Sequence, residues 1–92
     1  GAESISQAGD GFLLYPNPAS GNVAVRFFSS VDVPASIKVA RIDGLPLRKY
    51  RIDAHAGETR FDINIEGLPE GMYWVSLQCG EMQQRKKLVI VR

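Results

Sequence analysis

Phe61-Asp62-Ile63-Asn64-Ile65-Glu66 is the stretch of sequence that decides the fold. Apolar and polar residues alternate strictly along it, and this period of two is typical of a β-strand with one face in a core and one in water. Weaker alternation recurs along the chain, and no segment shows the 3.6-residue period of a helix. We therefore expect an all-β protein, with further strands at residues 12–15, 23–28, 37–42, 47–52, 72–78 and 84–91.

Turn residues separate these segments. Asp43-Gly44 is a strong hairpin signal, because the turn needs a positive φ that glycine adopts at the lowest cost. Leu68-Pro69-Glu70-Gly71 and Cys79-Gly80-Glu81 supply two further turns. Turn signals at intervals of roughly 8 to 12 residues and about seven short strands predict an Ig-like antiparallel β-sandwich. We expect a single domain over residues 12–92, preceded by a flexible linker over residues 1–11, which are rich in Gly, Ser and Ala.

The composition of the chain argues against several classes of protein. The chain has 92 residues, of which 45% are hydrophobic, and this is enough for one core without a disulfide or a metal. Its formal net charge of +1 gives no reason to expect nucleic acid or a lipid surface as a partner. A single cysteine rules out an internal disulfide. No apolar run approaches the roughly 20 residues of a membrane-spanning helix.

Candidate catalytic and metal-binding residues are isolated from one another in the sequence. His55 is the only histidine and lies in an expected loop without a Cys beside it, so we interpret it as a solvated loop residue. Cys79 precedes Gly80 and has no base near it, so we interpret it as a small turn or edge residue. The acidic residues follow no calcium-loop spacing. We expect no enzyme activity, no catalytic residue, no metal and no cofactor.

Two groups of residues leave binding functions open. Aromatic faces suit sugar stacking, so a small carbohydrate-binding or adhesive module is the alternative function, with a platform built from Trp74, Tyr15, Tyr50 and Tyr73. Tyr73, however, follows the core parity of its strand, and packing on a second face explains Trp74 equally well. Arg85-Lys86-Lys87 would suit a phosphate or an acidic partner, whereas a solvated edge that blocks unwanted strand pairing is the more ordinary explanation.

The two ends of the expected domain are its remaining unusual features. Tyr15-Pro16-Asn17-Pro18 ends the first short apolar run, since proline donates no ladder hydrogen bond, and we interpret this box as an architectural start without chemistry of its own. At the other end, Lys86-Lys87 precedes Leu88-Val89-Ile90-Val91. Apolar residues on both faces exceed what a half-exposed edge needs. We therefore expect one face of this strand to pack in the sandwich and the other, with Lys86 and Lys87, to meet a partner.

Four sequence boxes, taken in order, resemble a known family. They are Tyr15-Pro16-Asn17-Pro18-Ala19-Ser20-Gly21, Ile37-x-Val39 leading to Gly44, Leu68-Pro69-Glu70-Gly71-Met72-Tyr73, and Lys86-Lys87-Leu88-Val89-Ile90-Val91. Over residues 12–92 they resemble the type A C-terminal sorting domain of the type IX (Por) secretion system. Ala40, Arg41 and Leu45 depart from the residues that are common in that family.

The resemblance implies a role in protein transport in Bacteroidota. Such a domain directs a cargo protein from the periplasm across the outer membrane, and its partners are the outer-membrane shuttle and translocon proteins of the system. A sortase-like cell-surface peptidase then cuts upstream of the domain, so that the cargo is attached at the cell surface or secreted. The domain is then a signal and a substrate, not an enzyme, and it binds no nucleic acid.

The same resemblance gives the expected site residues. The signal or partner-binding residues are Lys86, Lys87, Leu88, Val89, Ile90, Val91 and Arg92, and the structural motif consists of Tyr15, Pro16, Asn17, Pro18, Gly44, Gly71 and Tyr73. The terminal strand would be able to add to a partner's sheet by main-chain pairing. An exposed edge strand of this kind would also allow a homodimer.

Overall fold

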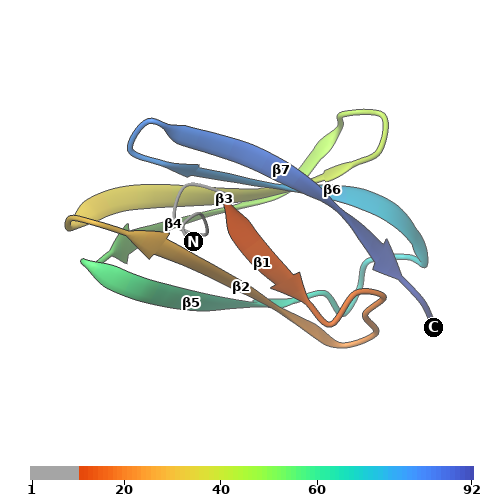
Figure 1. Ribbon diagram of the computed structural model, residues 1–92. Coiled ribbons are helices and arrows are strands. Elements are labelled where there is room, and N and C mark those ends of the chain that lie inside the picture. Colours follow the sequence, from red (N-terminus) through yellow and green to blue (C-terminus); the bar gives the residue numbers. More distant parts are fainter. Residues whose placement is uncertain (1–10) are drawn as a thin grey trace.

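Seven strands form two antiparallel sheets in the computed structural model, which describes residues 11–92 (Figure 1). One sheet has three strands in the order β1-β2-β5, and the other has four strands in the order β4-β3-β6-β7. The strands are β1 (Phe12–Tyr15), β2 (Asn22–Ser29), β3 (Val33–Arg41), β4 (Pro46–Ala54), β5 (Gly57–Asn64), β6 (Gly71–Cys79) and β7 (Met82–Ile90). The predicted all-β sandwich is therefore confirmed.

The core lies between the two sheets and follows from the alternation along each strand. Ile63 and Ile65 are buried, while Asp62 and Asn64 between and beside them are exposed, as the sequence predicted. A shift of one residue in any pairing would turn such an apolar set to solvent, so burial fixes the register. The largest fully buried side chains are Ile37, Ile63, Ile65, Leu77, Leu88, Ile90, Val23, Val25, Val39 and Val75.

The Asp43-Gly44 turn joins β3 and β4, as predicted. The Gly44 N–H donates to the Arg41 carbonyl over 2.8 Å, and the Arg41 N–H donates to the Leu45 carbonyl over 2.8 Å. Gly44 has a φ of 100°, a backbone conformation that residues with a side chain rarely adopt. The hairpin leaves β4 at an edge of the four-stranded sheet, where the charged side chains of Arg48, Lys49 and Arg51 discourage pairing with other chains.

Several strands extend beyond their predicted limits. The predicted loop at residues 55–58 is shorter, because β5 already begins at Gly57. The last strand begins at Met82 instead of Gln84. In both places main-chain pairing already includes residues before the alternating pattern starts, so the pattern alone began these strands too late.

Cys79 is not the turn or edge residue that the sequence predicted. It is the last residue of β6, lies opposite Ala35 of β3, and is 7% exposed. Its free thiol belongs to the core. The prediction was wrong because Gly80, the next residue, suggested a turn that begins one position too early. A buried thiol of this kind behaves as a small apolar side chain.

The first residues of the described chain lie against β7. Gly11 is buried, and a Cβ at this position would collide with the side chain of Gln84. β1 follows at Phe12, where the folded domain was predicted to start. The linker predicted over residues 1–11 lies outside the described residues, apart from Gly11.

Candidate partner-binding site

β7 is an edge strand of the four-stranded sheet and carries most of the residues predicted as a signal. Leu88 and Ile90 are 0% exposed and belong to the core, whereas Val89 is half-buried and Val91, just beyond the strand, is 44% exposed. One face of the strand packs in the sandwich and the other is open, as predicted. The predicted signal is therefore also a part of the fold.

Lys86 and Lys87 lie on opposite faces of the sheet, so the prediction that both belong to the presented face is wrong for Lys86. Lys87 lies opposite Trp74, and its Nζ is 5.8 Å from the centre of that ring. Lys86 lies opposite the buried Val75, and its Nζ is 5.9 Å from the centre of the Phe12 ring. The two-residue period of the strand divides the basic step between the two faces.

The loop between β1 and β2 lies against the free edge of β7, near the end of that strand (Figure 1). The Asn17 side chain donates from Nδ2 to the Lys87 carbonyl over 2.8 Å and accepts at Oδ1 from the Val89 N–H over 2.9 Å. The Ala19 N–H donates to the Val89 carbonyl over 2.9 Å, and the Ala19 carbonyl accepts from the Val91 N–H over 2.9 Å. We call these hydrogen bonds the edge clip.

The edge clip joins the box around Asn17 to the last strand, two features that lie at opposite ends of the sequence. An amide side chain both donates and accepts, so Asn17 reproduces the hydrogen bonds of a neighbouring strand on an edge that would otherwise stay open. The box is thus more than an architectural start. Sequence reasoning missed this contact because Asn-Pro indicates a turn. The only available signal was an asparagine between Pro16 and Pro18, neither of which has an N–H to donate.

Replacing Asn17 by alanine tests the edge clip. Asn17→Ala removes two hydrogen bonds and leaves the Lys87 carbonyl and the Val89 N–H without these partners. We expect the free energy of unfolding to fall by about 1–2 kcal/mol, measured by denaturant unfolding with Trp74 fluorescence. Asn22→Ala is the matched control, because Asn22 is also exposed, and its change should stay within about 0.5 kcal/mol. Equal losses in the two variants would contradict a stabilising clip.

Arg92 fastens the end of the described chain to two loops. Its guanidinium donates from Nη2 to the Ile65 carbonyl over 2.8 Å and to the Leu68 carbonyl over 2.6 Å, and from Nη1 to the Ser20 carbonyl. Its main-chain N–H donates to Glu70 Oε1 over 3.1 Å. The β1–β2 loop and the β5–β6 connection thus meet at one side chain. Arg92 was predicted from the sequence as a signal residue, and nothing in the sequence indicated these contacts.

Other residues of the predicted structural motif hold turns and strand ends. Tyr73 is buried, and its hydroxyl donates to the Pro69 carbonyl, which ties the β5–β6 connection to β6. Gly71 begins β6 with a φ of 151°. Tyr15 ends β1, and the guanidinium carbon of Arg26 lies 6.0 Å from its ring centre. These residues position the loops that surround the end of β7.

The aromatic residues do not form the sugar-stacking platform considered from the sequence. The Arg85 guanidinium carbon lies 4.0 Å from the centre of the Trp74 ring and covers it. Tyr50 packs against the core, with its ring centre 5.1 Å from that of Phe61, and Tyr73 is buried. The structural basis for a carbohydrate-binding module is therefore missing from this set of residues.

Within residues 11–92, no group of three or more His, Cys, Asp or Glu side chains is placed to hold a metal ion. His55 is exposed, and its Nδ1 lies 3.9 Å from Asp32 Oδ1. Over the same described residues, no helix combines the length and the apolarity needed to cross a membrane.

The sequence of the sandwich matches a family of known function. A family model described as "Secretion system C-terminal sorting domain" matches residues 13–91. The chain belongs to this family. The sorting domain directs the secretion of cargo proteins by the Por (type IX) system, whose machinery recognises it, and it is not a catalytic domain. The resemblance predicted from the sequence is thereby confirmed, while the assignment to type A stays a prediction.

A solved structure shares the fold of the sorting domain. The crystal structure of dimeric latent PorU from Porphyromonas gingivalis matches with a TM-score of 0.66 and 14% sequence identity over 87% of this chain. The match covers 9% of the PorU chain, so the sorting domain corresponds in length to a small part of that protein. At this identity the likeness shows the fold alone. No curated protein matches the chain in sequence.

Proposed function

We propose that residues 86–92, held by the edge clip, form the part of the sorting domain that the secretion machinery recognises. The observation that supports this proposal is the division of β7 into a buried face and an open face. The buried face and the clip hold the strand in one conformation, so the open face with Lys87 and Val89 is presented without further ordering. Preorganisation of this kind lowers the entropic cost of binding.

The proposed route has three steps. The cargo protein reaches the periplasm, outer-membrane shuttle and translocon proteins bind the folded sorting domain, and a sortase-like cell-surface peptidase cuts upstream of it. The cargo then stays at the cell surface or is secreted. A cut before residue 11 would keep every described residue of the core and of the edge clip, since these lie between residues 12 and 91.

A reporter fusion tests this function. The 92-residue chain is joined to the C-terminus of a reporter that carries a periplasmic signal peptide, in cells with a working type IX system. We expect the reporter to reach the cell surface and to lose the domain there, as measured by surface labelling and by the mass of the labelled reporter. The same fusion in cells without the outer-membrane translocon should stay in the periplasm. Equal surface labelling in both strains would contradict the proposed route.

The homodimer expected from an exposed edge strand stays a prediction. The edge clip would compete with such a dimer, because it covers part of the same edge. Asn17 and Ala19 form hydrogen bonds with the main-chain groups of Lys87 and Val89 in β7 and of Val91 just beyond it. A second chain would have to displace the clip before it paired with this part of the strand. Main-chain addition to a partner's sheet at the same residues would meet the same obstacle.

A further inference from the structure

The outer face of the four-stranded sheet gathers cations from three of its strands. Lys38 on β3 lies opposite Lys49 on β4 and, on its other side, opposite Ser76 on β6, which in turn lies opposite Arg85 on β7. Residues directly opposite each other in antiparallel strands share a face of the sheet. The strand pairings place five cations there, which we call the basic face: Lys38, Lys49, Arg51, Arg85 and Lys87.

Among the described residues, acidic side chains do not compensate the charges of the basic face. Within residues 11–92 its cations form no ion pair, because the basic partners of the ion pairs there are Arg26, Arg41, His55 and Arg60. Asp53, at the end of β4, is the one acidic residue that the pairings among these residues place on the face. Lys38 and Lys49 face each other directly, and like charges in this position destabilise a sheet. An acidic surface laid over the face would offset that cost.

The three-stranded sheet shows the opposite arrangement. Arg26 and Arg60 also lie directly opposite each other, on the outer face of β2 and β5. Each has its own carboxylate, and the pKa of both arginines is raised above its usual value, first by the hydrogen bonds to Glu58 and Asp62. Both outer faces therefore carry cations, but only those on the three-stranded sheet are paired with carboxylates among the described residues.

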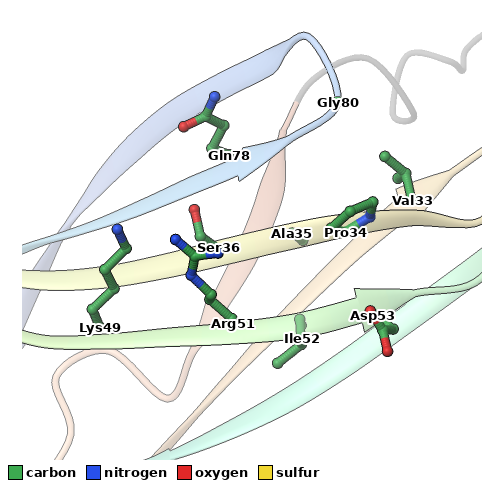
Figure 2. A pocket seen from close by; sticks show the side chains of 10 residues that line it. All are labelled: Val33, Pro34, Ala35, Ser36, Lys49, Arg51, Ile52, Asp53, Gln78 and Gly80. Carbon is green, nitrogen blue, oxygen red and sulfur yellow. The ribbon is translucent and has the colours of Figure 1, made fainter.

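The basic face is hollowed on one side and apolar on the other. Figure 2 shows Ser36, Lys49, Arg51 and Gln78 projecting from three neighbouring strands. These side chains line an open groove with a volume of about 690 Å³. On the far side of the cations, Trp74 lies beside the opposed pair Met72 and Val89, and Met72 is 47% exposed. Ile42, in the adjoining hairpin turn, is 48% exposed.

We propose that the basic face is a docking surface for a protein of the secretion machinery whose contact surface is acidic, with an apolar strip beside the acidic groups. Within residues 11–92 these cations have no carboxylate partner, and they lie next to the exposed Met72 and the half-buried Trp74. Such a combination is typical of a protein interface, in which an apolar centre supplies affinity and charge supplies steering and register. The face is continuous with the predicted signal, since Arg85, Lys87 and Val89 all come from β7. This inference rests on the proposed function and names the chemistry of the partner.

Charge reversal at the opposed lysines tests the proposal. Lys38→Glu/Lys49→Glu exchanges one pair of like charges for another, so the stability of the sheet should hardly change. In the reporter fusion we expect surface labelling to fall about tenfold or more, because the new carboxylates would meet an acidic partner. Lys38→Arg/Lys49→Arg keeps the charge and should restore labelling. Thermal unfolding of each variant shows that the fold is retained.

Arg26→Glu/Arg60→Glu is the matched control on the other sheet. It makes the same change in net charge at two directly opposed positions, and the ion pairs that it breaks are exposed and worth little. Thermal unfolding of this variant measures the cost of placing the new carboxylates beside Glu58 and Asp62. We expect secretion to change by about twofold at most. An equal loss in both double variants would overturn the proposal, since net charge alone would then explain the effect. Normal secretion of the Lys38→Glu/Lys49→Glu fusion would overturn it as well.

Photo-crosslinking identifies the class of partner. p-Benzoylphenylalanine is placed at Gln78, exposed on the basic face, or at Phe28, exposed on the other sheet and already aromatic. We expect a protein adduct from Gln78 only, weakened by Lys38→Glu/Lys49→Glu, with the crosslinked peptide mapping to an acidic surface. The proposal would be overturned by a crosslink between two copies of the fusion, by an adduct with a glycan or a lipid, or by the absence of any adduct. If the unchanged fusion fails to reach the surface, the proposed function itself fails, and this result is distinct from all of these.

Discussion

Leu88→Ala will lower the free energy of unfolding of the sorting domain by about 2–5 kcal/mol. Leu88 is 0% exposed and packs in the core between the two sheets. Truncation removes buried apolar contacts and leaves a cavity that the neighbouring strands cannot fill. Since domains of this size are stable by only about 5–15 kcal/mol, the loss is a large part of the total. Denaturant unfolding should show a lower midpoint with an unchanged slope.

Val91→Ala is the control for Leu88→Ala, because the two residues are close in sequence and both belong to the predicted signal. Val91 is 44% exposed, and its truncation should change the free energy of unfolding by less than about 0.5 kcal/mol. If both variants unfold at the same denaturant concentration, the division of β7 into a packed and an open face is wrong. The pair also separates roles in secretion, since a defect in Val91→Ala without loss of stability would point to direct recognition.

The strands were predictable because their signal is local. Alternation over a few residues indicates the strands, as at Phe61 to Glu66. Glycine, proline or aspartate indicates the turns, as at Gly44. The packed face of β7 was predictable for the same reason, because Leu88 and Ile90 differ by one strand period. The errors at Cys79 and Met82 lie at strand ends, where pairing with a neighbour decides the limit and alternation does not.

The functional surfaces were not predictable in the same way because they depend on pairings between distant strands. The edge clip joins Asn17 to residues 70 and 72 positions away, and nothing near Asn17 in the sequence indicates that partner. The basic face needs the pairing of β3 with β6, which brings Lys38 to the same row as Arg85. In the linear sequence these cations are scattered, and a net charge of +1 conceals them.

Arg92→Ala will lower the free energy of unfolding by about 2 kcal/mol, since hydrogen bonds from a charged donor to three carbonyl groups are lost together. The acceptors come from Ser20, Ile65 and Leu68, so the β1–β2 loop and the β5–β6 connection lose their common anchor. Denaturant unfolding measures the stability, and amide hydrogen exchange at residues 19–21 and 65–70 shows whether these loops open first. We expect exchange to rise there before it rises in β3 and β6.

Arg92→Lys distinguishes the geometry of this contact from its charge. A lysine keeps the positive charge but lacks the planar fork that reaches several acceptors at once, so we expect it to recover less than half of the lost stability. Full recovery by lysine would show that charge alone matters at this position. From the sequence, Arg92 was predicted to belong to the signal that the secretion machinery recognises. Unchanged stability in Arg92→Ala, together with lost secretion, would support that role and contradict the anchor inferred from the structure.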